Sequence, residues 1–561
     1  MKNLRDKEIS DVVNFLRNIV RAEYAANKNF LEYYAEKKYL DKVNNLQNQV
    51  IYGRRGTGKT HLLRALQEAV IVDFDNVRII PVYIDLRKFK PLLQESNPMY
   101  CALIVFKEIA LEVFAAIIEN IPTLFGLNEY TQSDLEHIKS IKQILQKYAE
   151  DLNYSLDGIN LTKLGDVDFD INEVKNYELS LGLSSQPYVG GKVERKEDLS
   201  GKDKRLKYIS FAEISEILNT LVFKLNLERV MLLLDEWSEI SKDYQYILAE
   251  LLKTAFIASG FTCKLAAIPN RTKLINDKRI GLEDGGDIFG ISLDNRFIYE
   301  INPLGTKAFF NELLFNHMST INPELFSEYY DKENKQPSVR FIEDFLNPNA
   351  MKELLIASSG IPRDFINIFI NSYMKYEDSG TTYKTISVRD VRKGTTEWYE
   401  VDKKKAVESQ QQAKILLDSI INEIIINRKS CHFLVPQLCS TNDWFQSLID
   451  LRVIHLRKEG ISHKGKKNVA YNVYYIDYAC YTSSNIYHNK IASDLLDSIN
   501  MSGDFDRIRR VSLEKEFFDT FNIQVGNSFK CPNCGEMVDT NHLAYINLKA
   551  CNMCFKKIEN I

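Results

Sequence analysis

Three groups of residues in this chain have the types and spacing that bind phosphate or metal ions. The first is the run Gly53-Arg54-Arg55-Gly56-Thr57-Gly58-Lys59-Thr60, which fits the pattern G-x-x-x-x-G-K-[ST] at every position. The glycines let backbone N–H groups curl around phosphate oxygens. The Lys59 ammonium then reaches the outer phosphates, and the Thr60 hydroxyl is suited to Mg²⁺. The run therefore predicts a loop that binds ATP with its magnesium ion.

The second group is a pair of acids at the end of an apolar run. Val230-Met231-Leu232-Leu233-Leu234 is followed directly by Asp235 and Glu236, and continuous apolar runs of this kind are typical of fully buried parallel strands. We expect Asp235 to hold Mg²⁺ together with Thr60, and Glu236 to orient and polarise the attacking water. The alternative is a core strand that ends in a solvated acidic turn, and the presence of the phosphate-binding run argues against it.

The third group consists of four cysteines near the C-terminus, Cys531, Cys534, Cys551 and Cys554. Sixteen residues separate the two C-x₂-C pairs, which is the spacing of a structural Zn²⁺ site. Four thiolates complete a tetrahedron around the ion and leave no position open for catalysis. The alternatives are free thiols or two disulfides, and His542 is a possible substitute ligand.

Two further residues stand where a side chain would reach the phosphates. Asn270, in Pro269-Asn270-Arg271, follows another buried strand and is expected to touch the γ-phosphate or the attacking water. Arg363, in Gly360-Ile361-Pro362-Arg363, opens a helix from which it would reach the phosphates. Taken alone, Arg363 also fits a surface arginine in an ordinary helix-initiating turn.

The neighbouring residues predict the elements that position these groups. The strand Val50-Ile51-Tyr52 precedes the phosphate-binding run and a helix beginning at His61 follows it, so we include His61 among the nucleotide-binding residues. A chance match in a glycine turn lacks this context. From Lys59 to Asp235 is 176 residues, far more than a strand–helix–strand unit of roughly 30 residues needs, so a segment is inserted between the motifs.

Periodicity and composition divide the chain into successive parts of a multidomain α/β protein. A strand is expected after Phe297, and the polar stretch Lys403–Gln412 reads as a linker. Three helices followed by a β-hairpin give the order of a winged helix-turn-helix. The predicted parts are a helical arm at 1–46, a P-loop ATPase core at 47–302 with an insertion at about 120–208, a helical lid at 303–400, a winged helix at 413–483, a helical connector at 484–525 and a zinc ribbon at 526–561.

Composition narrows the class of protein. The 561 residues are too many for one core, and the formal net charge of −4 excludes a global basic field, so any nucleic-acid contact must be local. Stretches of 18 apolar residues are absent, so we expect no membrane span. A polar N-terminus and scattered cysteines in apolar surroundings favour a cytoplasmic location.

The order of these motifs resembles the AAA+ ATPases of the origin-recognition and replication-initiator type, together with related bacterial ATPases of transposition and phage defence. The resemblance covers about residues 40–482. It implies an AAA+ core with a helical lid and a winged helix. The long insertion and the cysteine-rich tail depart from the family pattern and indicate a specialised relative.

Transferred residue by residue, the resemblance gives roles to the polar positions. Lys59 and Thr60 would bind phosphate and Mg²⁺, and Asp235 and Glu236 would be the magnesium and water acids. Asn270 would be the first sensor and Arg363 the second. Arg296 resembles the arginine finger that acts across a subunit boundary, with Arg271 or Arg279 as alternatives. An ATP-dependent oligomer follows from such a finger.

The residues give a divided prediction about DNA. The expected wing, His463-Lys464-Gly465-Lys466-Lys467, is basic enough for phosphate contacts, and Arg507, Arg509 and Arg510 form another patch. The expected recognition helix, 441–450, has two acids and no Lys or Arg, which argues against base readout. We expect non-specific contact with double-stranded DNA through the wing. Winged helices also bind proteins, and the zinc ribbon fits either partner.

Two functions remain after this comparison. The first is an ATP-hydrolysing AAA+ switch that oligomerises and couples its nucleotide state to DNA or a partner protein. The second is a nucleotide-gated scaffold that recruits a protein effector with little DNA dependence, as antiviral defence would require. A stand-alone zinc enzyme is disfavoured because four cysteine ligands leave the metal no open position.

Overall fold

The computed structural model describes most of the chain outside the expected insertion. The described residues are 3–20, 29–92, 98–124, 136, 139–143, 167–168, 206–207, 211–333, 336–380, 382–463, 466–482 and 511–558. The insertion at about 120–208, the wing tip at 464–465, and Arg507, Arg509 and Arg510 therefore lie wholly or largely outside the described residues.

The chain forms two compact units. The first, called here the sheet unit, contains Lys28–Gly53 and Lys59–Leu293. The second, called the C-terminal unit, contains Met1–Asn27, Arg54–Gly58 and Asp294–Ile561. The boundary runs through the glycine-rich loop, because its middle residues, Arg54–Gly58, belong to the C-terminal unit.

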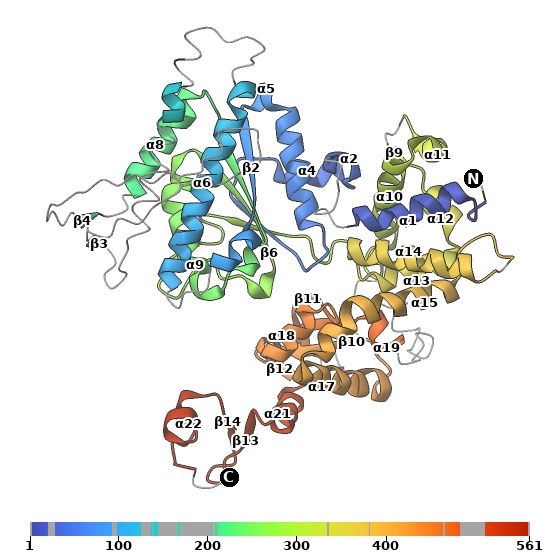
Figure 1. Cartoon of the computed structure of the whole chain (residues 1–561). Helices are drawn as coiled ribbons and strands as arrows, with labels where there is room; N and C mark the ends of the chain where they lie inside the picture. The colour runs from blue at the N-terminus through green and yellow to red at the C-terminus, as the bar shows by residue number, and fades with distance from the viewer. Residues whose placement is uncertain are drawn as a thin grey trace. The chain divides into compact units, whose positions relative to one another are not determined.

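A five-stranded sheet with parallel neighbours forms the centre of the sheet unit (Figure 1). Its strand order is β2-β5-β6-β1-β7. The bounds are β1 Gln49–Tyr52, β2 Ile79–Asp85, β5 Arg229–Asp235, β6 Phe261–Ala267 and β7 Phe289–Ser292. The predicted multidomain α/β class is confirmed, and the expected glycine-rich loop follows a strand of its parallel sheet. The strand that enters the glycine-rich loop and the strand that ends in the acids flank β6.

Helices cover both faces of this sheet because right-handed crossovers place them there. The connection from β1 to β2 carries α4 (Lys59–Val72) to one face. The connection from β5 to β6 crosses the sheet in the opposite direction, so its helix α9 (Lys242–Ala255) lies on the other face. There α9 packs beside α6 (Pro98–Leu124) and α8 (Phe211–Lys224) (Figure 1). The rings of Phe106, Phe256 and Phe261 pack in a row at tilted angles, with centroids 5.6 and 5.1 Å apart. Short helices complete the unit: α2 Phe30–Tyr33, α3 Lys37–Val43 and α5 Phe74–Val77.

Helices dominate the first part of the C-terminal unit. The N-terminal helix α1 (Lys7–Ile19) buries Ile9, Val12 and Leu16 and packs on α10 and α14. The helix bounds are α10 Pro303–Ile321, α11 Pro323–Phe326, α12 Arg340–Phe345, α13 Pro348–Ala357, α14 Pro362–Asp378 and α15 Val388–Tyr399. Two strands of two residues each, β8 Tyr330–Asp331 and β9 Gln336–Pro337, pair in antiparallel fashion.

Two sequence predictions in this region are wrong. The strand expected after Phe297 instead precedes it as β7, because residues 298–302 turn into α10. The expected linker Lys403–Gln412 is largely helical, with a π-helical segment Glu400–Lys404 that continues into α16 (Lys405–Glu408). Polar composition predicted solvent exposure, but Lys403 is only 2% exposed because two carboxylates neutralise it.

A small three-stranded antiparallel sheet with order β10-β12-β11 follows. The second of the three helices predicted before the β-hairpin, a short helix near Pro436, is absent. These residues instead form β10, which ends at Pro436 and is followed by a single 3-10 turn at Cys439–Thr441. The bounds are α17 Gln411–Ile420, a π-helical segment Ile421–Asn427, β10 His432–Pro436, α18 Asp443–Asp450, β11 Ile454–His463, β12 Lys466–Ile476 and α19 Tyr478–Thr482.

The chain ends in a cysteine-bearing module. Its elements are α21 Lys515–Gln524, β13 Ser528–Lys530, β14 Met537–Asp539 and α22 Leu543–Leu548.

Elsewhere, the expected insertion contains an isolated antiparallel strand pair, β3 Val167–Asp168 with β4 Leu206–Lys207. Among the described residues, no helix combines the length and apolar character needed to cross a membrane.

Candidate nucleotide-binding site

Two glycines give the phosphate-binding loop its shape. Gly56 and Gly58 have φ values of 85° and 93°, in the left-handed region that glycine adopts without a steric cost. At Gly56 a second reason applies, because an added Cβ would lie 3.0 Å from the Cβ of Arg363 and 3.1 Å from Ile361. The loop therefore requires glycine at Gly56 both for its backbone conformation and for its packing.

Lys59 begins α4 and turns back onto the loop. Its ammonium donates to the Gly53 carbonyl at 2.7 Å, and the Gly53 N–H donates to Ala267 at the end of β6 at 3.0 Å. Lys59 is nearly buried, and Thr60 follows it in the first turn of the helix. The loop thus presents an ammonium and a hydroxyl at the start of one helix, where a phosphate and its cation would bind.

The acids lie at the carboxyl end of β5, as the apolar run predicted. Asp235 is fully buried and accepts hydrogen bonds from the Tyr83 hydroxyl at 2.7 Å and from the Glu236 backbone at 2.8 Å. These two donors fix the carboxylate in place. Tyr83 lies on β2 and is held from the other side by Arg64 of α4, whose guanidinium sits 3.5 Å from the ring centroid.

Glu236 has the features of a reactive carboxyl group. Burial and the neighbouring Asp235 raise its pKa, although Lys59 and Arg87 act in the opposite direction. Its backbone is left-handed, with φ 56°, which is uncommon for a residue with a side chain and is found most often at functional positions. Glu236 therefore combines a desolvated carboxyl with a strained backbone at the tip of the acid strand.

Sequence reasoning missed Tyr83, Asp85 and Arg87. Asp85 ends β2 directly beside Asp235 and pairs with Arg87 at 2.6 Å, and Arg87 lies 3.9 Å from Glu236. A polar tyrosine and an aspartate at the end of an otherwise apolar strand were the available signal. The parallel register of β2 and β5 brings them to the same edge.

Asn270 lies in the 3-10 turn Pro269–Arg271 that follows β6, the strand between β1 and β5. The turn is tied to the acid segment because the Ser238 hydroxyl accepts from the Ile268 backbone at 2.6 Å, and Thr272 donates to the Ile268 carbonyl at 2.7 Å. Asn270 is exposed at this edge of the sheet.

Arg363 packs against the loop within the C-terminal unit. Its backbone N–H donates to the Gly56 carbonyl at 3.3 Å, and its guanidinium lies 3.8 Å from Asp402. Its side chain is 18% exposed, so it is not a freely solvated surface arginine. Gly360 permits this approach, because an added Cβ there would lie 2.5 Å from the Phe297 carbonyl oxygen.

Other predicted residues have different surroundings. The His61 imidazole does not face the loop: its Nε2 lies 2.8 Å from the Phe30 carbonyl, its ring meets Phe30 and Tyr34 edge-on, and burial lowers its pKa to about 4. The imidazole therefore contacts Phe30 of α2, and this contact gives no support to a nucleotide contact by the side chain. Arg55 is exposed, and Arg296 lies 5.0 Å from the Phe297 ring.

A buried chain of charges joins the loop to the three-stranded sheet within the C-terminal unit. Arg54 binds Asp294 at 2.9 Å and contacts the Nδ1 atom of His455. The opposite ring nitrogen of His455 lies 2.8 Å from Asp477, so the imidazole links a loop arginine to a strand-end carboxylate. This link was invisible to sequence reasoning because 401 residues separate Arg54 from His455.

The same chain of charges continues to α14, which carries Asp364. Asp477 binds Lys403 at 2.8 Å, and Lys403 binds Asp364 at 3.1 Å. Asp364 also binds Arg452 at 2.5 Å, and Arg452 contacts Asp402. Burial alone would raise the pKa of Asp364, but Arg452 and Lys403 outweigh it and hold this pKa well below its ordinary range. The residues Arg54, Asp294, Asp364, Asp402, Lys403, Arg452, His455 and Asp477 are called the ionic cluster below.

The four cysteines converge at the C-terminus. Their sulfur atoms all lie within 4.8 Å of one another, with 3.9 Å between Cys531 and Cys554 and 3.8 Å between Cys534 and Cys551. A tetrahedral zinc ion with bonds of about 2.3 Å separates its sulfurs by roughly 3.8 Å, so the set fits zinc. A disulfide requires about 2.05 Å, so the pairs are not bonded.

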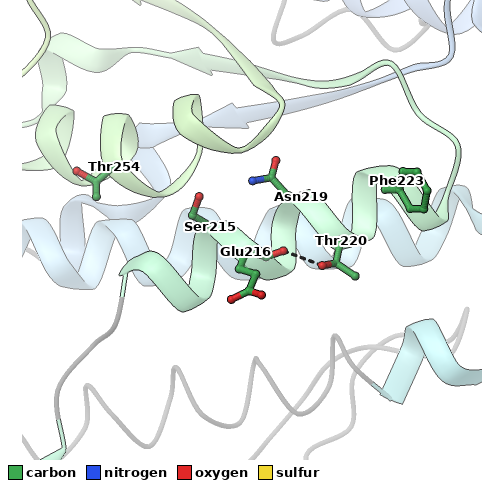
Figure 2. A pocket seen from close by; sticks show the side chains of 6 residues that line it. All are labelled: Ser215, Glu216, Asn219, Thr220, Phe223 and Thr254. Carbon is green, nitrogen blue, oxygen red and sulfur yellow. Dashed lines mark hydrogen bonds between the residues drawn. The ribbon is translucent and has the colours of Figure 1, made fainter.

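A hollow on the sheet unit lies apart from this chemistry. Figure 2 shows it between α8 and α9, lined by Ser215, Glu216, Asn219, Thr220, Phe223 and Thr254. The hydroxyl of Thr220 is occupied by the Glu216 carbonyl at 2.8 Å. None of these lining residues belongs to the glycine-rich loop or the acid pair, so this hollow is not the nucleotide site.

Comparison with known protein families gives a match in the region of the glycine-rich loop. A family model described as ORC-CDC6-like matches residues 17–88, which contain the glycine-rich loop and β2. The search of curated proteins finds no match.

Solved structures of three organisms are similar at low identity. The Aeropyrum pernix ORC1 protein, solved in complex with DNA, is 10% identical, with 84% of this chain and 98% of that chain covered and a TM-score of 0.32. The Thermotoga maritima RuvB Holliday junction branch migration motor is 10% identical, with 81% and 96% covered and a TM-score of 0.28. Drosophila ORC bound to DNA is 11% identical, with 85% and 97% covered and a TM-score of 0.29.

Because these TM-scores are low, the fold assignment rests on the strand order and on the placement of the motifs. The loop follows β1, the acids follow β5, and β6 separates the two strands. The chain therefore contains a parallel α/β core whose glycine-rich loop region is similar to the ORC-CDC6-like family.

Proposed function

We propose that this chain binds and hydrolyses ATP and uses the nucleotide state as a switch. The observation that carries the proposal lies in the sheet unit. Lys59, at the start of the helix after β1, binds Gly53, which is hydrogen-bonded to the end of β6, and Glu236 follows the end of β5, the strand beside β6. An ammonium for the phosphates and a desolvated carboxyl for the water thus belong to one edge of one sheet. Catalysis of phosphoryl transfer consists mostly of such positioning.

The residues divide the work by their chemistry. Lys59 would exchange the Gly53 carbonyl for phosphate oxygens, and Glu236 would accept a hydrogen bond from the attacking water and align it. The Thr60 hydroxyl and the Asp235 carboxylate are hard oxygen ligands suited to Mg²⁺, which would supply positive charge to the phosphate oxygens. Tyr83 holds the Asp235 carboxylate in position. Asn270, in the turn that follows β6, would be the first sensor of the γ-phosphate, and the family resemblance gives Arg363 the role of the second.

The switch would act through the C-terminal unit. In the loop, Arg54 contacts His455 and the Gly56 carbonyl accepts from the Arg363 backbone. A change in loop conformation would therefore move groups that His455 and Arg363 contact. We infer that ATP favours an oligomer, with Arg296 as the finger supplied to a neighbouring subunit. We also infer that the β11–β12 hairpin, read as a wing, contacts double-stranded DNA without sequence preference, as the basic residues of this segment suggest.

Titration calorimetry with Mg·ATP tests the binding step. Lys59→Ala should lose at least tenfold in ATP affinity, because the loop loses the one ammonium aimed at the phosphates. Lys88→Ala is the matched control, since Lys88 is an exposed lysine of the same unit that pairs with Glu112. Unchanged affinity in Lys59→Ala would show that the loop does not bind phosphate in this way.

The second candidate function, a nucleotide-gated scaffold that recruits a protein effector, is favoured by one observation. Helix α18, at the position of a recognition helix, offers acids and no basic residue. ATP turnover measured with and without double-stranded DNA separates the two functions. Stimulation by DNA supports the DNA-coupled switch, and a slow rate that ignores DNA supports the scaffold.

A further inference from the structure

The two cysteine pairs of the C-terminal module form hairpins with the same backbone. In the first, Gly535 N–H donates to the Cys531 carbonyl at 2.9 Å and Cys531 N–H donates to Glu536 at 2.8 Å. In the second, Phe555 N–H donates to the Cys551 carbonyl at 2.9 Å and Cys551 N–H donates to Lys556 at 3.0 Å. The strand pairings also match, Lys530 with Met537 and Ala550 with Lys557.

The hairpins differ at the residue after the second cysteine. Both residues are left-handed, with φ 75° at Gly535 and 57° at Phe555. Glycine adopts this conformation freely, whereas a bulky side chain adopts it at a steric cost. An added Cβ at Gly535 would meet nothing within 4 Å, so both hairpins have room for a side chain. The backbone therefore favours glycine at both positions, and the second hairpin carries phenylalanine.

Packing does not explain Phe555 either, because its side chain faces solvent. It is 74% exposed, and four further apolar residues within the preceding twelve positions are exposed as well: Leu543 70%, Ile546 52%, Leu548 63% and Met553 60%. These five residues are called the apolar surface of the module. Leu543 and Ile546 are three residues apart on α22 and share one helix face. Single exposed apolar residues are ordinary, but five within thirteen positions of one small module expose more apolar surface than scattered residues do, and exposed apolar surface of this kind favours a protein contact.

The charges around this surface indicate the kind of partner. The exposed lysines Lys549, Lys556 and Lys557 lie in the same segment, whereas the acids Glu536 and Asp539 belong to the first hairpin and β14. Nucleic acid is disfavoured, because its affinity comes mainly from phosphate contacts, and here three lysines accompany five exposed apolar side chains that a phosphate backbone cannot contact favourably. An apolar centre with a polar rim is the anatomy of a protein interface.

We propose that the apolar surface of the zinc module, centred on Phe555, docks an amphipathic segment of a partner protein whose polar face is acidic. The surface requires the folded zinc module and does not depend on ATP hydrolysis, so it holds under either candidate function. Phe555 would be the central anchor, because a rigid aromatic side chain supplies contact area at a small entropic cost. The lysines would then pair with the acidic flanks of the partner.

Fluorescence anisotropy with the full-length, zinc-loaded chain tests the proposal. The probe is a labelled helical peptide with leucines at i, i+3, i+4 and i+7 and glutamates on its polar face. We expect it to bind at least tenfold more tightly than the same peptide with lysines in place of the glutamates. Phe555→Gly, which copies the first hairpin, and Leu543→Ser should each weaken binding at least fivefold. Phe223→Ser is the control, since Phe223 is 85% exposed on α8.

Zinc content and resistance to a chelator provide the second readout. Phe555→Gly should retain zinc and resist the chelator as well as wild type or better, because glycine relieves the left-handed backbone. Loss of zinc in this variant would assign Phe555 a structural role and overturn the proposal. Equal binding of both peptides, or displacement of the acidic peptide by a DNA oligonucleotide that Phe555→Gly no longer binds, would overturn it as well.

Discussion

The sheet edge and the ionic cluster are both charged and buried, yet they are built differently. In the cluster nearly every charge faces an opposite charge: Lys403 lies between Asp364 and Asp477, and Arg452 between Asp364 and Asp402. At the sheet edge, two acids follow one another, and burial raises the pKa of Glu236. Saturated pairs specify a structure, whereas a carboxyl left beside a like charge is available for chemistry.

The largest expected effect comes from breaking a saturated pair. Asp364→Asn should lower the free energy of unfolding of the C-terminal unit by about 3–5 kcal/mol, because Lys403 and Arg452 would lose their shared buried carboxylate. Denaturant unfolding measures this. Lys404→Met, which removes an exposed lysine one residue from Lys403, should change stability by only about 0.5 kcal/mol. Equal effects of the two variants would mean that the cluster contributes nothing specific.

The cluster also predicts a loss of stability in acid. His455 is fully buried, and burial together with Arg54 and Arg457 lowers its pKa well below the ordinary value, although Asp477 acts in the opposite direction. Below about pH 6.5, His455 therefore binds a proton in the unfolded chain but stays neutral in the folded chain. The free energy of unfolding consequently falls as the pH falls.

Stability measured between pH 7 and pH 5 tests this sign. His455→Gln should flatten part of the slope, since glutamine can donate to Asp477 without titrating. His61, whose pKa burial lowers to about 4, contributes a slope of the same sign that the variant leaves in place. A slope unchanged by His455→Gln, or stability that rises in acid, would contradict the neutral state assigned to His455.

The smallest effect concerns the hydrogen bond that fixes Asp235. Tyr83→Phe should lower the free energy of unfolding by about 1 kcal/mol, because the buried Asp235 carboxylate loses a donor while the ring is kept. Thermal or denaturant unfolding measures it, with Tyr246→Phe as a control at a partly exposed tyrosine of α9. A Tyr83→Phe variant as stable as wild type would show that solvent replaces the hydroxyl at the sheet edge.

Local patterns account for what the sequence predicted well. The glycine-rich loop, the acids after β5, the parallel sheet and the cysteine spacing each depend on residues close together in the chain. The ionic cluster joins residues up to 401 positions apart and leaves no local pattern. The Lys403 segment was predicted to be a linker for the same reason: the carboxylates that pair with Lys403 are distant in the sequence, so its lysines were expected to be exposed to solvent. The surroundings of the His61 imidazole were not predicted, because the short helix α2, whose Phe30 carbonyl lies against the ring, has no strong pattern in the sequence.

The most direct test of the central claim is the steady-state ATPase rate of wild type and Glu236→Gln. A matched control is Glu239→Gln, which changes a carboxylate three residues away that pairs with Lys90. We predict that Glu236→Gln lowers the rate by roughly 10²- to 10⁴-fold while ATP still binds, and that Glu239→Gln keeps most of it. A Glu236→Gln enzyme that hydrolyses ATP at the wild-type rate would contradict the assignment of the sheet edge as the catalytic site.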